Sequence, residues 1–347
     1  NGGFQIKYHL GGSLTIKATD ITTAVGDNVV QLGDDAFQQG NVPITGILRL
    51  PMLITNATEF EKALAVMRPY LERAFDKKGV TLLANYYFPM QIAWSSKKLT
   101  SLDDFKNQKI RATSPEQIEF LKRFGANGLT VGGSEVPSAL ERGVVDGVLT
   151  ANAGGGKIWK DLLKYCYEIG LNYFEDNIVV NKEAYAKLPA AYKESLTKAI
   201  VELTPKMTTM MAQEEIDEAA KRKAEGMVQT DATPADYKRG AEKMVSYWDE
   251  WAKPKGAETQ EAQERLLQDH RRDRERGVDD HRAERVRHDV PEQYRRVTRA
   301  QRLCGLHERL MLQAQHLPAD DACHGEPLHE PQGHEQHDEA LGEEHEQ

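Results

Sequence analysis

One helix-to-strand pattern occurs twice in this chain, and it restricts the possible folds more than any other feature. It is present in "TDITTAVGDNVVQLGD" and, much later in the chain, in "SEVPSALERGVVDGVLT". Each copy offers a Ser or Thr that can cap a short helix, a glycine that ends it (Gly26, Gly143), and an apolar strand over residues 29–32 or 144–149. Such units are typical of α/β layers with parallel sheets, so two distant copies predict two similar lobes.

The segments around the two copies complete a two-lobed α/β fold. Their patterns predict a helix over residues 59–77, strands over 80–86 and 91–95, a helix in "KIWKDLLKYCYEIG" and a strand in "NIVVN". A long helix follows Pro189 and should bend at Pro205, and a last helix should run from 233 to 251. A chain that crosses to a second lobe and returns through a long helix leaves a cleft between the lobes, where ligands bind.

The predicted domain boundaries follow the crossings between lobes. Lobe I takes residues 1–88 and 177–215, lobe II takes residues 89–176, and the helices of residues 216–254 pack on the lobes. The crossings near Phe88 and residues 173–177 predict a hinge, together with the bend at Pro205.

The predicted tail, residues 255–347, differs in composition from everything before it. No lysine follows Lys255, whereas 13 of the 21 arginines and 10 of the 11 histidines come after it. Residues 1–255 hold 32 acidic and 32 basic side chains, so the net charge of −9 belongs to the tail. The first part is therefore a neutral globular protein without a nucleic-acid signal. The tail is expected to be disordered, and its abrupt change is typical of a gene read out of frame.

Two functional interpretations of the tail are weaker than this. A metal-binding tract lacks the two-plus-two spacing of zinc sites; its ligands would be Cys323, His324, His329, His334 and His337. An arginine-rich arm for nucleic acid does not fit a segment that is net acidic. We therefore predict no metal, no cofactor and no nucleic-acid partner.

The first residues of the chain and its cysteines say little about the cellular compartment of the protein. The chain opens with "NGGFQIKYHLGGSL", which contains no predicted signal peptide and is typical of the middle of a protein. Cys166 is the only cysteine of the globular part, so no disulfide can form within that part. No apolar run reaches membrane-spanning length.

Arg111 lies where a predicted strand ends and a helix begins. In "QKIRATSPEQIEFLKRFGA", residues 109–112 alternate like a strand end. Ser114 is then the predicted N-cap, Pro115 the first helical residue and Gln117 the capping-box partner. A guanidinium fork beside a helix N-terminus suits bidentate binding of a carboxylate. A surface arginine in a salt bridge is the alternative.

Several motifs together resemble one protein family. "KIRATSPEQIEFLKRFGANGLTVGGSEVPSALERGVVDGVLT" is similar to the signature stretch of the TRAP transporter substrate-binding proteins, the DctP family. "DNIVVNKEAYAKLPAAYKESL" resembles a later segment of that family, and "IKYHLGGSL" and "GILRLPML" resemble its early strand and turn. The resemblance covers residues 3–253. It implies a two-lobed periplasmic-binding-protein-like α/β fold with a ligand cleft between the lobes and a long kinked C-terminal helix.

The resemblance also implies a function, partners and a location. It predicts a monomeric periplasmic solute receptor, not an enzyme, that binds a small organic acid carboxylate and delivers it to the membrane subunits of a TRAP transporter. In this family the arginine after the "K-I" pair forms a salt bridge with the ligand carboxylate, and here that position is Arg111. The family's chain also begins with a strand and a helix that would precede Asn1, and we expect lobe I to lack them.

Three positions differ from the sialic-acid branch of the family. By spacing from Arg111, Gln91 stands where that branch has a second arginine, Gly133 replaces an aromatic residue, and Thr150 replaces an asparagine. Without a second ionic clamp, the pocket should be more polar and open on that side. Gln91 and Thr150 are expected to contact the ligand as neutral partners.

Two further ligand-binding candidates come from the strand pattern. Tyr87 shares a strand face with Pro89 and Gln91, because alternate residues point to the same side, although it could also be an ordinary core aromatic. Asn152 follows Thr150 at the end of "VDGVLT", the edge where open α/β sheets place ligands. The glycines at 154–156 lack the P-loop pattern and predict a flexible loop near the cleft.

Two other function classes stay open. A sensory module that passes ligand binding to a kinase or chemoreceptor would use the same cleft. A small-molecule enzyme is less favoured, because His9 is the only histidine of the globular part and no Ser, His and Asp arrangement is present.

Overall fold

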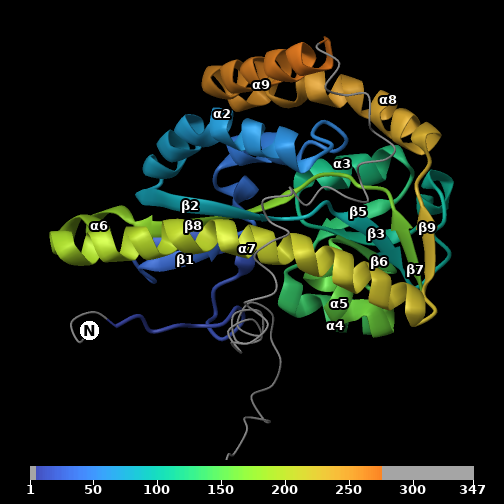
Figure 1. The fold of residues 1–347 in the computed structure, drawn as a ribbon, viewed down its shortest axis with the longest axis horizontal. Coiled ribbons are helices and arrows are strands. Elements are labelled where there is room, and N and C mark those ends of the chain that lie inside the picture. The colour runs from blue at the N-terminus through green and yellow to red at the C-terminus, as the bar shows by residue number, and fades with distance from the viewer. Residues whose placement is uncertain (1–4, 276–347) are drawn as a thin grey trace, which may run out of the picture. The chain divides into compact units, whose positions relative to one another are not determined.

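The computed structural model describes residues 5–275, which contain two β-sheets and the helices around them (Figure 1). The first sheet has the strand order β1-β8-β2, and the second has the order β5-β4-β6-β3-β7-β9. This mixed architecture confirms the predicted α/β class. The strands are β1 Leu32–Asp35, β2 Val80–Phe88, β3 Ile92–Ser95, β4 Lys109–Ala112, β5 Asn127–Thr130, β6 Gly147–Thr150, β7 Tyr165–Glu168, β8 Phe174–Asn181 and β9 Val228–Asp231.

The helices cover both sheets and begin at the expected kinds of cap. Asn56 accepts a hydrogen bond from Glu59 N at the start of α2, and Thr233 and Asp236 form a capping box at the start of α8. The helices are α1 Ile21–Gly26, α2 Ala57–Asp76, α3 Pro115–Arg123, α4 Val136–Glu141, α5 Lys157–Trp159, α6 Lys182–Lys187, α7 Ala190–Ala224, α8 Pro234–Trp251 and α9 Ala257–Glu275.

The two copies of the helix-to-strand pattern form the predicted helices but enter different sheets. In the second copy, β6 pairs in parallel with β4, as predicted, and antiparallel with β3. In the first copy, β1 pairs antiparallel with β8, and the strand begins at Leu32 because Asn28 turns the chain with a positive φ and Val29 is exposed. The prediction of a parallel sheet is therefore wrong for β1.

The long helix α7 runs along both sheets (Figure 1). It contacts β2 of the first sheet, where Thr208 accepts a hydrogen bond from Tyr87 N, and it contacts the segment that follows β6 of the second. The helix continues across Pro205 without a break. On the other face of β2, α2 packs through Phe60 and Met67.

Two short segments carry the chain between the sheets, residues 89–91 and residues 169–173. They bond to each other, since Gln91 N donates to Asn172 O at 2.8 Å and Leu171 N donates to Gln91 O at 2.9 Å. β8 begins at Phe174, so the first sheet starts slightly before the predicted boundary at residue 177.

The predicted helix in "KIWKDLLKYCYEIG" is wrong over its second half. Only residues 157–162 are helical, and Tyr165–Glu168 form strand β7 between β3 and β9. Cys166 and Tyr167 are both fully buried, because a central strand is covered on both faces. A short apolar run of this kind fits a buried strand as well as a helix, so periodicity alone could not decide.

The C-terminal helices correct the predicted start of the tail. α9 packs on α2 through the buried side chains of Ala262 and Leu266, and Tyr70 donates to Glu261 at 2.9 Å. Residues 257–275 are therefore helical rather than disordered, because their two or three apolar residues at helical spacing find a partner surface. The candidate metal tract and the rest of the tail lie outside the described residues.

Among the described residues, no helix combines the length and the apolar character needed to cross a membrane.

Candidate anion-binding site around Arg111

The backbone around Arg111 follows the predicted strand-to-helix turn. Arg111 is in β4, between the parallel strands β5 and β6. Ser114 caps α3 by accepting from Gln117 N, and Pro115 is the first helical residue. The Gln117 side chain accepts from Thr113 N at 2.7 Å rather than from the cap residue itself. The turn is thus held by side-chain contacts that do not involve Arg111.

The Arg111 guanidinium is buried and bonded only to main-chain carbonyls. Only 4% of the surface of Arg111 is exposed to solvent. Nε donates to Val131 O at 2.9 Å and Nη1 donates to Leu149 O at 3.1 Å, and no described carboxylate forms an ion pair with it. Burial, with a smaller contribution from the Arg49 charge, lowers the pKa of Arg111 to about 9, which leaves it charged at neutral pH. A buried cation without a counterion favours an anionic ligand.

Aromatic side chains lie beside this cation and pack on one another, and we call Phe37, Phe88, Trp159 and Phe174 the aromatic wall. The Arg111 Cζ lies 5.8 Å from the Phe37 ring centroid and 5.4 Å from that of Trp159. Phe174 makes edge contacts with Phe37 at 5.9 Å and with Phe88 at 5.8 Å. Phe88, Trp159 and Phe174 are buried, so most of the aromatic wall is shielded from solvent.

Arg49 is a second buried guanidinium that the sequence analysis missed. Its Nε donates to Glu175 Oε2 at 2.8 Å, and its Nη2 donates to the Glu175 and Ala36 carbonyls at 2.6 and 2.8 Å. Glu175 also accepts from Gln38 at 2.9 Å, and the Arg49 Cζ lies 4.1 Å from the Phe174 ring. Burial raises the pKa of Glu175, although Arg49 opposes this. An arginine inside the apolar run "ITGILRLPML" was the available signal.

Two of the predicted site residues lie away from the aromatic wall. The Tyr87 ring packs against Phe60 and Tyr173 on the α2 side of β2, and its hydroxyl donates to Glu61 at 2.9 Å. Its neighbour Phe88, on the opposite face, joins the wall instead. Gln91 is buried in the crossing between the sheets, where its Nε2 donates to Pro89 O at 3.3 Å.

Thr150 and Asn152 lie beside the Arg111 strand, but both side chains are already bonded. Thr150 Oγ1 accepts from Gly155 N at 2.9 Å, and Asn152 Nδ2 donates to Glu215 Oε1 at 2.6 Å. β6 neighbours β4, with Val148 opposite Arg111, and the guanidinium donates to Leu149 O, one residue before Thr150.

We call residues Asn152–Gly156 the glycine loop. It forms one turn of π-helix whose residues are all buried, so the predicted flexible loop is instead a packed one. A Cβ on Gly155 would overlap the Trp159 ring, and one on Gly156 would overlap the Trp94 ring. Glycine is therefore required for the close approach of this loop to two tryptophans.

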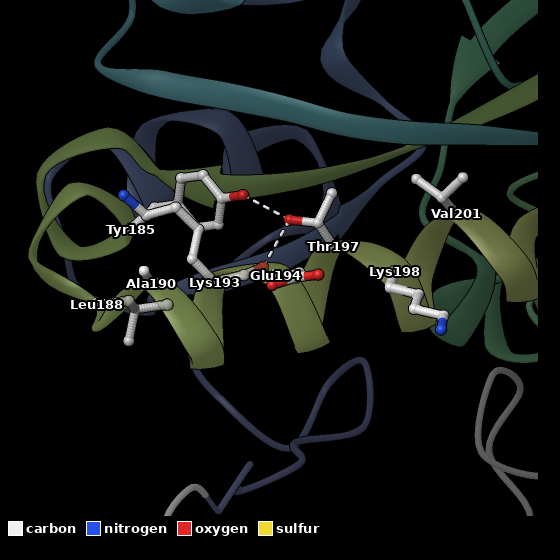
Figure 2. A pocket seen from close by; sticks show the side chains of 8 residues that line it. All are labelled: Tyr185, Leu188, Ala190, Lys193, Glu194, Thr197, Lys198 and Val201. Carbon is white, nitrogen blue, oxygen red and sulfur yellow. Dashed lines mark hydrogen bonds between the residues drawn. The ribbon is translucent and has the colours of Figure 1, made fainter.

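A surface groove at the α6–α7 corner is a weaker candidate site (Figure 2). It encloses about 590 Å³ and is lined by Tyr185, Leu188, Ala190, Lys193, Glu194, Thr197, Lys198 and Val201. The Tyr185 hydroxyl bonds to Thr197, whose hydroxyl donates to Lys193 O, so these polar groups are engaged with one another (Figure 2). The described residues also contain no group of three or more His, Cys, Asp or Glu side chains placed to hold a metal ion.

Comparisons with known proteins agree with this fold. The model of the family described as bacterial extracellular solute-binding protein, family 7 (DctP) matches residues 1–254. The C4-dicarboxylate-binding periplasmic protein DctP of Rhodobacter capsulatus is 30% identical over 190 residues, which covers 53% of this chain and 56% of that protein. An uncharacterized protein of Haemophilus influenzae is 28% identical over 130 residues, 37% of this chain and 40% of its own. The chain thus spans about half the length of the curated relatives that it matches.

Solved structures of solute receptors share the fold. DctP7, an extracytoplasmic solute receptor of Bordetella pertussis that binds pyroglutamic acid, is 26% identical, with a TM-score of 0.68 over 75% of this chain and 86% of that one. DctP6 of the same organism is 24% identical, with a TM-score of 0.69 over 74% and 86%. Taken with the family match over residues 1–254, this shows that the chain belongs to the DctP family of bacterial extracellular solute-binding proteins.

Proposed function

We propose that this protein is a periplasmic receptor that binds a small organic acid through Arg111 and delivers it to the membrane subunits of a TRAP-type transporter. The observation that carries the proposal is the buried Arg111 guanidinium, which has only two carbonyl partners and no ion pair with a described carboxylate. A ligand carboxylate would supply the missing counterion as a charge-assisted, bidentate partner. The receptor would act as a monomer and would release its ligand unchanged.

The aromatic wall supports a compact, partly apolar ligand. Phe37 and Trp159 lie within 6 Å of the Arg111 guanidinium carbon, and an apolar ring or short chain would stack against them. Pyroglutamate, the ligand of DctP7, has one carboxylate on a small ring and is the first compound to test. A C4-dicarboxylate, as in the name of the Rhodobacter relative, is the second.

Binding would bring the two sheets together around the ligand. Arg111 lies in β4 of the second sheet and Trp159 in α5. Phe174 lies in β8 of the first sheet, and Phe37 follows β1. The crossing segments, residues 89–91 and 169–173, would act as the hinge. Gln91, in this crossing, would affect closure rather than touch the ligand, and Thr150 and Asn152 would shape the site through the glycine loop.

Isothermal calorimetry of the purified protein with pyroglutamate and succinate tests the proposal. Arg111→Ala should weaken binding of the better ligand by roughly 2–5 kcal/mol, because the carboxylate would be buried without a partner. Arg111→Lys should also bind more weakly, because it keeps the charge but loses the fork.

Arg142→Ala is the matched control, since Arg142 is exposed and its side chain bonds, among the described residues, to Ser138 O. It should bind like the parent. Recovery of unchanged ligand after incubation would separate a receptor from an enzyme. If Arg111→Ala binds within a factor of three of the parent, less than about 1 kcal/mol, Arg111 is not the carboxylate anchor.

A further inference from the structure

Two buried polar atoms beside the aromatic wall have no hydrogen-bond partner among the described residues. They are the acceptor Gln38 Oε1 and the donor Arg49 Nη1. Both residues are 0% exposed, so bulk water cannot reach either side chain. A buried donor or acceptor without a partner is costly and calls for an explanation. The two atoms together favour a group that offers one donor and one acceptor.

The side chains of Gln38 and Arg49 are held by the same carboxylate. Gln38 Nε2 donates to Glu175 Oε1 at 2.9 Å, and Arg49 Nε donates to Glu175 Oε2 at 2.8 Å. Glu175 lies in β8, and the two donors come from the short 3-10 turns Gln38–Gly40 and Pro43–Arg49. Because Glu175 accepts at both oxygens, it fixes the Gln38 amide with Nε2 toward the carboxylate and Oε1 away from it. The unpaired acceptor therefore follows from the hydrogen bonding.

Ring contacts of the aromatic wall connect these side chains to Arg111. The Arg49 Cζ lies 4.1 Å from the Phe174 ring centroid, the Phe174 and Phe37 centroids are 5.9 Å apart, and the Arg111 Cζ lies 5.8 Å from that of Phe37. Gln38 follows Phe37 directly in the chain. After burial, the Arg49 charge is the second cause of the lowered pKa of Arg111, so the two cations interact. Two guanidinium groups thus share one pair of aromatic rings.

The two ends of this ring pair favour different ligand groups. Arg111 has no ion pair with a described carboxylate, whereas Glu175 already neutralises Arg49. A second ligand carboxylate at Arg49 would place an anion beside Glu175 and would offer no donor to Gln38 Oε1. A neutral amide avoids both problems, because its carbonyl accepts from Arg49 Nη1 and its N–H donates to Gln38 Oε1.

We propose that Gln38 and Arg49 form an amide-binding subsite of the Arg111 site, so that the ligand is a compact carboxylate that also carries a lactam or carboxamide. This inference rests on the carboxylate site proposed above, and it makes Gln38 the residue that selects the N–H group. Such a ligand would be held from the first sheet through its amide and from the second sheet through its carboxylate.

The ligand is the safest place to begin the test, because changes at Arg49 would disturb the fold. Calorimetry compares pyroglutamate with its lactone analogue, in which a ring oxygen replaces the N–H, and with tetrahydrofuran carboxylate, which lacks the ring carbonyl as well. The parent should bind the lactone at least about tenfold more weakly than pyroglutamate, because Gln38 Oε1 stays unpaired. Tetrahydrofuran carboxylate should bind several-fold more weakly again, because Arg49 Nη1 then has no acceptor.

Gln38→Met tests the selecting residue, since methionine keeps the length of the side chain and removes the amide. Pyroglutamate should lose its advantage, and the ratio of the two affinities should fall to about threefold or less. A Gln38 that only supports Glu175 would weaken both compounds equally and leave the ratio unchanged. Gln39→Met is the matched control and should keep the parent ratio. Gln39 is also buried and its Nε2 is unpaired, but among the described residues it makes no hydrogen bond to Glu175.

The subsite is overturned if the parent does not bind pyroglutamate or binds the lactone within threefold of it, a comparison that needs no variant to fold. It is also overturned if Gln38→Met keeps the parent ratio or if Gln39→Met loses it. Equal affinity for the lactone and tetrahydrofuran carboxylate would remove Arg49 Nη1 from the subsite. Arg111→Ala should weaken pyroglutamate and the lactone alike, because both keep the carboxylate. Unchanged affinity in that variant would count against the proposed function instead.

Discussion

Two of the buried arginines, Arg49 beside the first sheet and Arg111 in the second, differ in what neutralises their charge. Arg49 is paired with Glu175, itself buried, and bonds to two carbonyls. Arg111 has two carbonyl partners and no ion pair with a described carboxylate. A buried cation that carries its own counterion serves the fold, whereas one without a counterion is available to a ligand. The comparison therefore separates a guanidinium with a structural counterion from the one that we propose as the ligand anchor.

The largest change in the free energy of unfolding is expected when Arg49 is removed and its partner Glu175 is left in place. Arg49→Met would leave Glu175 buried without its cation and should lower the free energy of unfolding by about 3–5 kcal/mol. Without Arg49 the pKa of Glu175 would rise further, so the loss should be smaller at pH 5 than at pH 8, because a raised pKa favours the neutral acid as the pH falls. Urea unfolding followed by circular dichroism measures both.

The double variant Arg49→Met with Glu175→Leu is the internal control for this experiment. It removes both charges and should recover most of the loss, because apolar residues can replace a buried pair. A double variant that is no more stable than Arg49→Met would show that Arg49 acts through other contacts.

Smaller changes, in stability on one face of β2 and in ligand affinity on the other, should distinguish the two faces of this strand. Tyr87→Phe removes the hydroxyl that donates to Glu61 and should cost about 0.5–1.5 kcal/mol of stability without changing ligand affinity. Phe88→Leu removes the edge contact with Phe174 and should cost a similar amount, about 0.5–1.5 kcal/mol, in ligand binding. Calorimetry and urea unfolding on both variants give the comparison. Loss of affinity in Tyr87→Phe would place the ligand at Tyr87, the contact that the strand pattern predicts.

The smallest change in stability is expected for Arg111→Met. The variant removes a desolvated charge but leaves the Val131 and Leu149 carbonyls without donors, and these two terms oppose each other. The free energy of unfolding should change by less than about 1 kcal/mol, the size of one ordinary hydrogen bond. A loss as large as that of Arg49→Met would mean that both arginines serve the fold, and the distinction between them would fail.

Local signals predicted the parts of the molecule that are built from neighbouring residues. The Ser114 cap, the strand end at Arg111 and the helix of residues 59–77 follow from residue types within a few positions of each other. The α/β class followed from the repeated pattern for the same reason. The helix predicted around Cys166 is wrong, and this segment forms strand β7 instead. The burial of β7 on both faces depends on its neighbours in the sheet, which the local sequence does not reveal.

Contacts between distant segments could not be predicted from one sequence. Arg49 and Glu175 are 126 residues apart, and Asn152 and Glu215 are 63 apart. Tyr87 and Phe88 are equally aromatic, so only the position of α2 determines which of them packs against Phe60 and which joins the aromatic wall. α9 was missed because its few apolar residues become informative only against the surface of α2.

The rotation of α7 about its own axis is fixed by the two places where its side chains are attached. Thr208 bonds to the first sheet and Glu214 to the segment after the glycine loop, with the intervening residues spanning about 9 Å of helix axis. Pro205 lies before both attachments, so the helix between them has its full ladder of hydrogen bonds and resists torsion. One residue inserted between positions 208 and 214 would rotate the second attachment by about 100° around the helix axis, out of phase with the loop. Little more than one and a half turns of a single helix thus link an attachment at the first sheet to one at the second, and they fix the rotation between these two attachments.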